Sequence, residues 1–139
     1  MTPTPSLIEK IKKIKCLVCD LDGVMTSGLL FYDDFGHELK AFHVHDGIGL
    51  KLLMAVDIHV AVITGAMNAG VDYRMQALGI KHYFTKQINK QAAFEKLQKD
   101  LNLEKQAFAY IGDDFPDIPL IQQVGFGIAV ANATPYVKK

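Results

Sequence analysis

Residues 15–26 read KCLVCDLDGVMT, an apolar run that ends in two closely spaced carboxylates. The apolar part predicts a buried β-strand over residues 14–20. Asp20 ends this strand and Asp22 follows it, with Gly23 next to the second carboxylate. Aspartate is depleted from strands and is seldom buried without a partner. We therefore expect a ligand or counter-ion for these charges where this strand ends.

The rest of the chain alternates between helical and strand patterns. Helices are expected over residues 6–13, 47–56, 68–78 and 89–101, and strands over residues 58–64, 82–84, 107–111 and 126–130. Mostly apolar strands that alternate with helices indicate a parallel sheet covered on both faces. The predicted fold class is α/β, a three-layer α/β/α Rossmann-like domain.

Residues 28–44, GLLFYDDFGHELKAFHV, interrupt this alternation. Two strand-like arms flank DDFG, which predicts an inserted β-hairpin. Tyr32 and Phe35 near its tip are expected to form an oligomer contact. His43 and His45 are placed on one side of a strand, and two such ligands are too few for a zinc site. We expect solvent or subunit contacts for this pair, with a substrate contact by His45 left open.

Bulk composition limits the function classes. The 139 residues suit one domain, 1–139, and the 15 basic and 15 acidic side chains give zero net charge. This balance argues against general binding to nucleic acid or to a membrane surface. No apolar run could span a bilayer and no secretory signal is evident, so we expect the cytoplasm. Cys16 and Cys19 sit three apart in a strand, on opposite faces, and are read as buried thiols.

Polar residues recur where the predicted strands end. Thr64 and Gly65 follow one strand, and GDDFPD follows another with Asp113, Asp114 and Asp117. Ligands bind beyond the carboxyl ends of strands in parallel α/β sheets. Five carboxylates there would repel unless a cation were present, and hard oxygen ligands indicate Mg²⁺. The alternative is that GDDFPD only caps a helix.

An anion is indicated beside these carboxylates. Lys90 lies in the first turn of its predicted helix, where the helix dipole disfavours a cation unless an anion is near. The hydroxyl of Thr64 and the backbone at Gly65 also suit an anion. A solvated surface lysine and a strand-end hydroxyl are the plainer alternatives.

These motifs, in this order, resemble the haloacid dehalogenase superfamily. CLVCDLDGVMT is similar to its first motif, VITG to its second, Lys90 to its third and GDDFPD to its fourth. The hairpin, HDGIGL, ALGIKH and AYIGDDFPDIPLI most resemble the 3-deoxy-D-manno-octulosonate 8-phosphate phosphatases, which have no large cap domain. The resemblance implies a cytoplasmic bacterial sugar phosphatase in lipopolysaccharide synthesis, assembled as a homotetramer through the hairpins.

The resemblance also implies roles for the site residues. Asp20 would be the nucleophile that forms an aspartyl-phosphate, and Asp22 the general acid and base. Mg²⁺ would be held by Asp20, the backbone carbonyl of Asp22 and Asp113. Thr64, Gly65 and Lys90 would hold the phosphate, while Asp114 and Asp117 support the site, Asp117 by orienting Lys90.

Two departures bear on the substrate. The family usually has a basic residue after ITG and an arginine in the segment corresponding to HVHDG, where this chain has Ala66 and His45. Arg74 matches a basic family position and is a further candidate for substrate contact. The tail is also shorter than in the family. A sialic-acid 9-phosphate therefore remains an alternative substrate. A receiver domain and a non-catalytic assembly subunit are alternatives of other classes.

Overall fold

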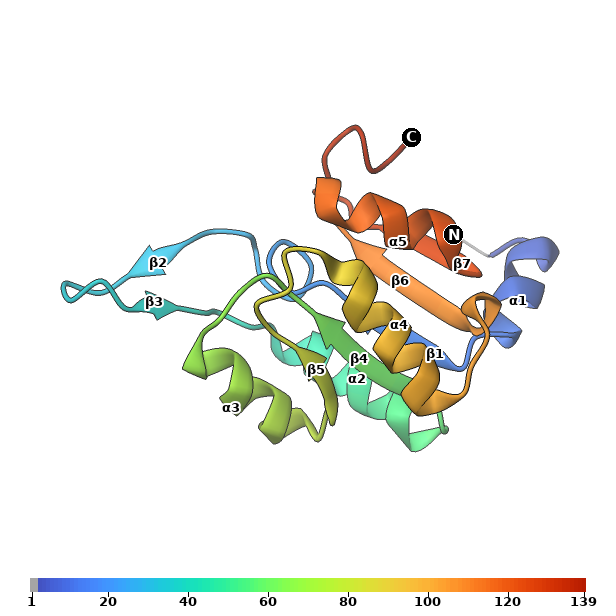
Figure 1. Ribbon diagram of the computed structural model, residues 1–139, viewed down its shortest axis with the longest axis horizontal. Helices are drawn as coiled ribbons and strands as arrows, with labels where there is room; N and C mark the ends of the chain where they lie inside the picture. The colour runs from blue at the N-terminus through green and yellow to red at the C-terminus, as the bar shows by residue number, and fades with distance from the viewer. Residues whose placement is uncertain (1–2) are drawn as a thin grey trace.

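The computed structural model describes residues 3–139 and contains one parallel sheet. Its five strands lie in the order β5-β4-β1-β6-β7, with β1 at the centre (Figure 1). Their bounds are β1 Cys16–Cys19, β4 His59–Ile63, β5 His82–Phe84, β6 Phe108–Gly112 and β7 Phe126–Ala129. The α/β class and the parallel sheet predicted from the sequence are confirmed.

Helices cover both faces of the sheet. The bounds are α1 Pro5–Lys12, α2 Val44–Ala55, α3 Ala69–Leu78, α4 Lys90–Leu101 and α5 Ile118–Gln123, with short 3-10 turns η1 Lys105–Ala107 and η2 Phe115–Asp117. One apolar core packs β1 and β6 against Phe94 and Leu97 of α4. A second core packs the opposite face against Leu50 of α2 and Met75 of α3. The molecule therefore has three layers.

The two cysteines separate between these cores, as their spacing predicts. Cys16 packs in the α4 core and Cys19 in the α2 and α3 core. Burial raises the pKa of each thiol to about 12. Both are therefore protonated at neutral pH and serve as core residues.

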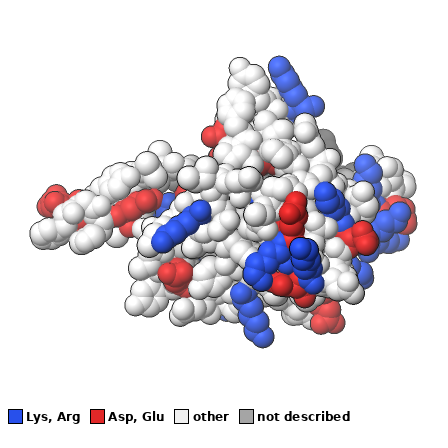
Figure 2. All heavy atoms as spheres, in the orientation of Figure 1, with Lys and Arg blue, Asp and Glu red and all other residues white. Residues whose placement is uncertain are grey.

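A hairpin projects from the body of the molecule (Figure 1). Its strands, β2 Phe31–Tyr32 and β3 Glu38–Leu39, pair antiparallel and are only two residues long. Asp33 fixes the turn because its Oδ1 accepts hydrogen bonds from the backbone N–H groups of Phe35 and His37, at 2.9 and 2.8 Å. Figure 2 shows acidic side chains on the hairpin amid much uncharged surface.

The predicted boundary between the hairpin and the next helix is wrong. The sequence pattern extended the hairpin to residue 44 and started the helix at residue 47, but α2 begins at Val44. His43 caps this helix, because its Nδ1 accepts a hydrogen bond from the N–H of His45 at 3.1 Å. His43 and His45 therefore occupy the start of a helix and not one side of a strand. Histidine is not a usual N-cap residue, so the start was not recognised.

None of the helices formed by residues 3–139 has both the length and the apolar character that crossing a membrane requires. The longest two contain 12 residues each.

Candidate active site

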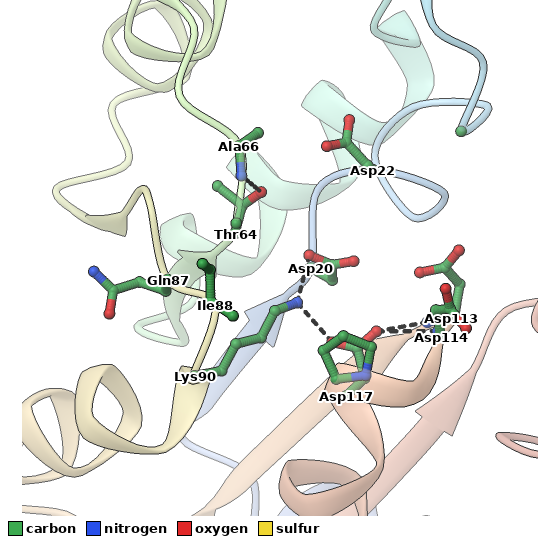
Figure 3. Close-up of a pocket in the computed structure, with 13 residues that line it drawn as sticks. Asp20, Asp22, Thr64, Ala66, Gln87, Ile88, Lys90, Asp113, Asp114 and Asp117 are labelled. Atoms are coloured by element: carbon green, nitrogen blue, oxygen red, sulfur yellow. Dashed lines mark hydrogen bonds and ion pairs between the residues drawn. The ribbon is translucent and has the colours of Figure 1, made fainter.

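The acidic residues and the residues predicted to bind phosphate meet where the C-terminal ends of the strands lie (Figure 3). They surround an open cavity of about 460 Å³. Its lining residues are Asp20, Asp22, Gly28, Thr64, Gly65, Ala66, Gln87, Ile88, Lys90, Asp113, Asp114, Pro116 and Asp117. Residues up to 97 positions apart in the chain thus share one cavity because parallel strands end at the same edge.

Lys90 is the buried cation of this cavity. It is the first residue of α4, which starts there because Oδ1 of Asn89 accepts the N–H of Gln91 at 3.0 Å. Its Nζ donates to Oδ1 of Asp20 and to Oδ1 of Asp117, each at 2.7 Å. The side chain is 6% exposed, so the alternative of a solvated surface lysine is wrong.

Asp117 is held by four hydrogen bonds. Its Oδ1 accepts from Lys90 and from the hydroxyl of Tyr110, at 2.7 Å each. Its Oδ2 accepts from the backbone N–H groups of Asp113 and Asp114, at 3.0 and 3.2 Å. This carboxylate therefore fixes both Lys90 and the loop that carries Asp113. The hydrogen bond to Lys90 is the contact that an orienting role of Asp117 requires, and the role itself stays a prediction.

Two glycines permit this close packing. A Cβ on Gly112 would lie 2.4 Å from Cβ of Asp117, so only glycine lets Asp117 fold back over the end of β6. Gly23 has φ +83°, and a Cβ there would lie 2.0 Å from Oδ2 of Asp113. Gly23 therefore turns the chain after Asp22 and leaves room for the Asp113 side chain.

Asp20, Asp113 and Asp117 form a group of the kind that binds a metal ion. One carboxylate oxygen from each lies within 4.8 Å of the others. Burial raises the pKa of Asp20 to about 7, against the opposing effect of Lys90. Burial and the charge of Asp117 raise the pKa of Asp113. One ammonium group therefore undercompensates the three carboxylates, and a divalent cation would favour their ionised form. These oxygen donors fit Mg²⁺.

Thr64 is buried at the end of β4 and faces the cavity (Figure 3). Its Oγ1 accepts a hydrogen bond from the N–H of Ala66 at 3.0 Å. Within residues 3–139 the Thr64 hydroxyl donates to no other group, so its hydrogen can bind an acceptor in the cavity. Gly65 follows on the exposed rim of the cavity.

Asp22 and Asp114 have other partners. The Asp22 side chain is partly exposed and pairs with Lys40 of the hairpin segment. Asp114 caps η2, since its Oδ1 accepts the N–H of Phe115 at 2.8 Å. GDDFPD therefore both caps a helical turn and supplies the acidic cluster, so the two interpretations of this motif hold together.

The two candidates for substrate contact lie outside this cavity. Arg74 donates to the backbone carbonyl of His43 at 3.1 Å, and its guanidinium lies 5.5 Å from the ring centroid of Phe42. His45 lines a separate hollow with His43 and Asp46. Within one chain, neither Arg74 nor His45 lines the cavity that contains the acidic residues.

Several residues of the site were not predicted from the sequence. Gln87 and Ile88 line the cavity after β5, and the same strand-end rule could have identified them. Tyr110 is buried inside β6, where its pattern indicates only a core residue. Lys40 meets Asp22 across 18 positions of sequence, and no local signal predicts that contact.

Comparison with known proteins agrees with this geometry. Residues 79–139 match the model of the haloacid dehalogenase-like hydrolases. The 3-deoxy-D-manno-octulosonate 8-phosphate phosphatase KdsC of Yersinia pestis is 43% identical over 129 residues, which cover 93% of this chain and 69% of that protein. The chain belongs to the 3-deoxy-D-manno-octulosonate 8-phosphate phosphatase family.

Solved structures of this phosphatase family and its superfamily share the fold. A putative haloacid dehalogenase superfamily subfamily III A hydrolase from Legionella pneumophila is 61% identical, with a TM-score of 0.94 over 95% of this chain and 72% of that one. The family enzyme of Moraxella catarrhalis, solved with magnesium, phosphate and 3-deoxy-D-manno-octulosonate, is 40% identical. Its TM-score is 0.93, over 97% of this chain and 78% of that one.

Membership of this phosphatase family excludes one of the alternatives drawn from the sequence. The receiver domain is excluded, because the chain aligns with phosphatases over nearly its whole length. The absence of a large cap is also consistent with the family: within residues 3–139 the only insertion between sheet elements is the hairpin.

Proposed function

We propose that this chain is a single-domain, Mg²⁺-dependent phosphatase that hydrolyses 3-deoxy-D-manno-octulosonate 8-phosphate to the free sugar acid and phosphate. The supporting observation is the convergence of Asp20, Asp113 and Lys90 on one cavity in a chain of this family. The M. catarrhalis enzyme, solved with magnesium, phosphate and the sugar acid, supports the same cofactor and product here.

Asp20 is the proposed nucleophile. Lys90 occupies its Oδ1, which leaves the other carboxylate oxygen to attack the phosphorus of a bound ester. Attack forms a bond from Asp20 to phosphorus and breaks the bond to the sugar oxygen, giving an aspartyl-phosphate. Water then attacks this phosphorus and releases inorganic phosphate together with the carboxylate of Asp20.

Asp22 is the proposed general acid and base. It lies two residues beyond the nucleophile and at the cavity, so it can meet the sugar oxygen on the side away from Asp20. It gives a proton to the departing alkoxide and later takes one from the attacking water. The two carboxylates thereby divide nucleophilic and proton-transfer chemistry between them.

The phosphoryl oxygens are assigned to Thr64, Gly65 and Lys90. The free hydroxyl hydrogen of Thr64 and the ammonium of Lys90 donate to them. The metal ligands assigned are Asp20, the backbone carbonyl of Asp22 and Asp113, with Asp117 and Asp114 holding the loop. Mg²⁺ bound there would withdraw charge from the phosphoryl oxygens.

Assembly is the second part of the proposal. Leu30, Tyr32 and Phe35 of the hairpin are 60%, 60% and 86% exposed. Such an apolar surface is typical of an interface, and we assign it to a homotetramer built through the hairpins. Arg74 and His45 lie outside the cavity of their own chain, so any substrate contact by them requires a neighbouring subunit. A cytoplasmic location stays a prediction.

Phosphate release in magnesium tests the function. The octulosonate 8-phosphate should give a higher kcat/KM than a sialic-acid 9-phosphate, and chelation of magnesium should abolish both activities. Asp20→Asn should abolish turnover of p-nitrophenyl phosphate as well, because it removes the nucleophile. Turnover retained by Asp20→Asn would refute the mechanism, and a preference for the sialic-acid phosphate would refute the substrate.

A further inference from the structure

The side chain of Lys40 joins the hairpin to the loop that carries Asp22. Lys40 follows β3, and its side chain is 3% exposed. Its Nζ lies 2.5 Å from Oδ1 of Asp22 and 2.5 Å from Oε1 of Glu38. A buried ammonium group needs compensating charge, and here two carboxylates supply it.

The electrostatics of Lys40 favour its charged form. Desolvation lowers the pKa of Lys40, but its interactions with the carboxylates of Asp22 and Glu38 outweigh this effect and raise the pKa. Within residues 3–139, Oε1 of Glu38 has no aligned hydrogen-bond donor, so its contact with Lys40 is ionic. Glu38 therefore interacts with Lys40 through its charge, whereas Asp22 accepts the hydrogen bond from Lys40.

The hairpin arm that carries Lys40 is itself anchored. The backbone carbonyl of Glu38 accepts a hydrogen bond from Nδ2 of Asn68 at 2.6 Å. The other side-chain atom of Asn68, Oδ1, caps α3 by accepting the N–H of Gly70 at 2.7 Å. One asparagine thus ties the base of the hairpin to a helix that packs on the sheet, and this fixes the origin of the Lys40 side chain.

Asp22 has little else to hold its carboxylate. Its side chain is 38% exposed, and Figure 3 shows it set apart from the Lys90 and Asp117 group. Within residues 3–139 Lys40 is the only side chain that donates to it. An exposed aspartate without this contact would sample several rotamers, and proton transfer to a leaving group requires one orientation.

We propose that Lys40 is a positioning residue for the reaction: it holds the Asp22 carboxylate at the leaving-group side of the cavity. This inference rests on the phosphatase function proposed above. It makes the base of the hairpin part of the catalytic apparatus, in addition to any role of the hairpin tip in assembly.

The leaving group provides a selective test of this role. An alkoxide needs a proton as it leaves, whereas p-nitrophenolate is a stable anion that leaves without one. kcat/KM reports the steps up to aspartyl-phosphate formation, where only the alkyl ester depends on Asp22 as an acid. Loss of the Asp22 orientation should therefore lower kcat/KM for the alkyl ester far more than for the aryl ester.

Lys40→Met is the variant to measure with 3-deoxy-D-manno-octulosonate 8-phosphate and with p-nitrophenyl phosphate. We expect kcat/KM to fall about hundredfold for the sugar phosphate and less than about fivefold for the aryl phosphate. Lys40→Arg, which keeps the charge, should recover at least about tenfold of the sugar phosphate loss. Lys40→Gln serves the same comparison, with a smaller selective loss, if Lys40→Met does not fold.

Lys96→Met is the matched control, because Lys96 also pairs with a carboxylate, Asp100 at 2.7 Å, but on an exposed helix surface. It should leave both activities unchanged. Equal losses on the two substrates, or no loss, in the folded Lys40 variants would overturn the positioning role while the wild-type activity stands. If the wild type hydrolyses neither ester, the function itself fails, and the role of Lys40 with it.

Discussion

Tyr110 shows how a residue that does not line the cavity can control the site, through its hydrogen bond to Asp117. Tyr110 is fully buried in β6, and its hydroxyl shares Oδ1 of Asp117 with Lys90. Burial and the nearby charge of Asp117 raise the pKa of Tyr110, so it remains a protonated donor across the working pH range. The Asp117 carboxylate accepts from both side chains, so the Tyr110 hydroxyl helps to fix the position of Lys90.

Tyr110→Phe should therefore weaken both stability and catalysis. The change removes one hydrogen bond to a carboxylate, which we expect to cost about 1.5 kcal/mol of unfolding free energy and about tenfold in kcat. Denaturant unfolding and steady-state kinetics measure the two effects. Tyr83→Phe on β5 makes the same chemical change away from the Asp117 group, and an equal loss of kcat in both variants would contradict this account.

For single residues, the sequence predicted the chemical groups of the site but not all of their contacts. Asp20, Thr64 and Asp113 were predictable because strand ends of a parallel sheet converge, and Lys90 because a cation in the first turn of a helix indicates a nearby anion. Tyr110 and Lys40 were not, because the partner of a buried hydroxyl or ammonium group depends on side-chain packing across distant segments. The second oxygen of Asp117 illustrates this, since it binds two backbone N–H groups that sequence patterns do not specify.

The hairpin combines two functions in one element. Its base is anchored by Asn68 and carries Lys40, whereas its tip exposes Tyr32 and Phe35. Two-residue strands supply few backbone hydrogen bonds, and a lone hairpin of this length is marginal in water. We therefore expect contacts between subunits to hold the tip in place.

Tyr32→Lys with Phe35→Lys tests this expectation. Both side chains are exposed within one chain, so the monomer fold should persist and its stability should change by less than about 0.5 kcal/mol. The apolar contact would be lost, so light scattering should report a species smaller than a tetramer. Val56→Lys, an equally exposed apolar position at the end of α2, should leave the assembly intact. An unchanged mass for the hairpin variant would contradict the proposed interface.

Element boundaries were predictable where the sequence supplies a cap. Asn68, Gly79 and Asn89 delimit α3 and the start of α4, and the structure begins or ends these helices within a residue of the predicted positions. The start of α2 was missed because His43 caps it with a ring nitrogen. The pattern of apolar residues alone could not separate the last hairpin residues from the first helical turn.

For the whole molecule, the acidic cavity links stability to pH and to magnesium. The pKa of Asp20 rises from an ordinary 3.8 to about 7 in the folded chain. Between these values the folded state binds more protons than the unfolded state, so the free energy of unfolding falls as pH rises through this window. Above it, the metal-free protein bears the full cost of the ionised carboxylates.

Magnesium should therefore raise the Tm more at pH 8 than at pH 6, at one fixed concentration of the ion, because it binds the ionised carboxylates. Thermal unfolding with and without the ion measures the difference. Asp20→Asn should show a smaller rise at pH 8 and a weaker pH dependence between pH 4 and 7 without metal. Equal magnesium effects at both pH values would contradict this linkage.

The arrangement of the sheet was only partly predictable at this largest scale. Apolar strands alternating with helices indicated a parallel sheet with two covered faces, and both features are present. The central place of β1 between β4 and β6 did not follow from the sequence, since strand order depends on which crossover packs best. That order nonetheless brings Asp20 between Thr64 and Asp113.

The two free thiols in the central strand of the sheet give this molecule an internal reporter of its own unfolding. Cys16 and Cys19 face opposite cores, so a thiol reagent can modify either one only when the layer above it separates from the strands. Their alkylation rates, compared site by site, would reveal whether the two helical layers detach together or one before the other.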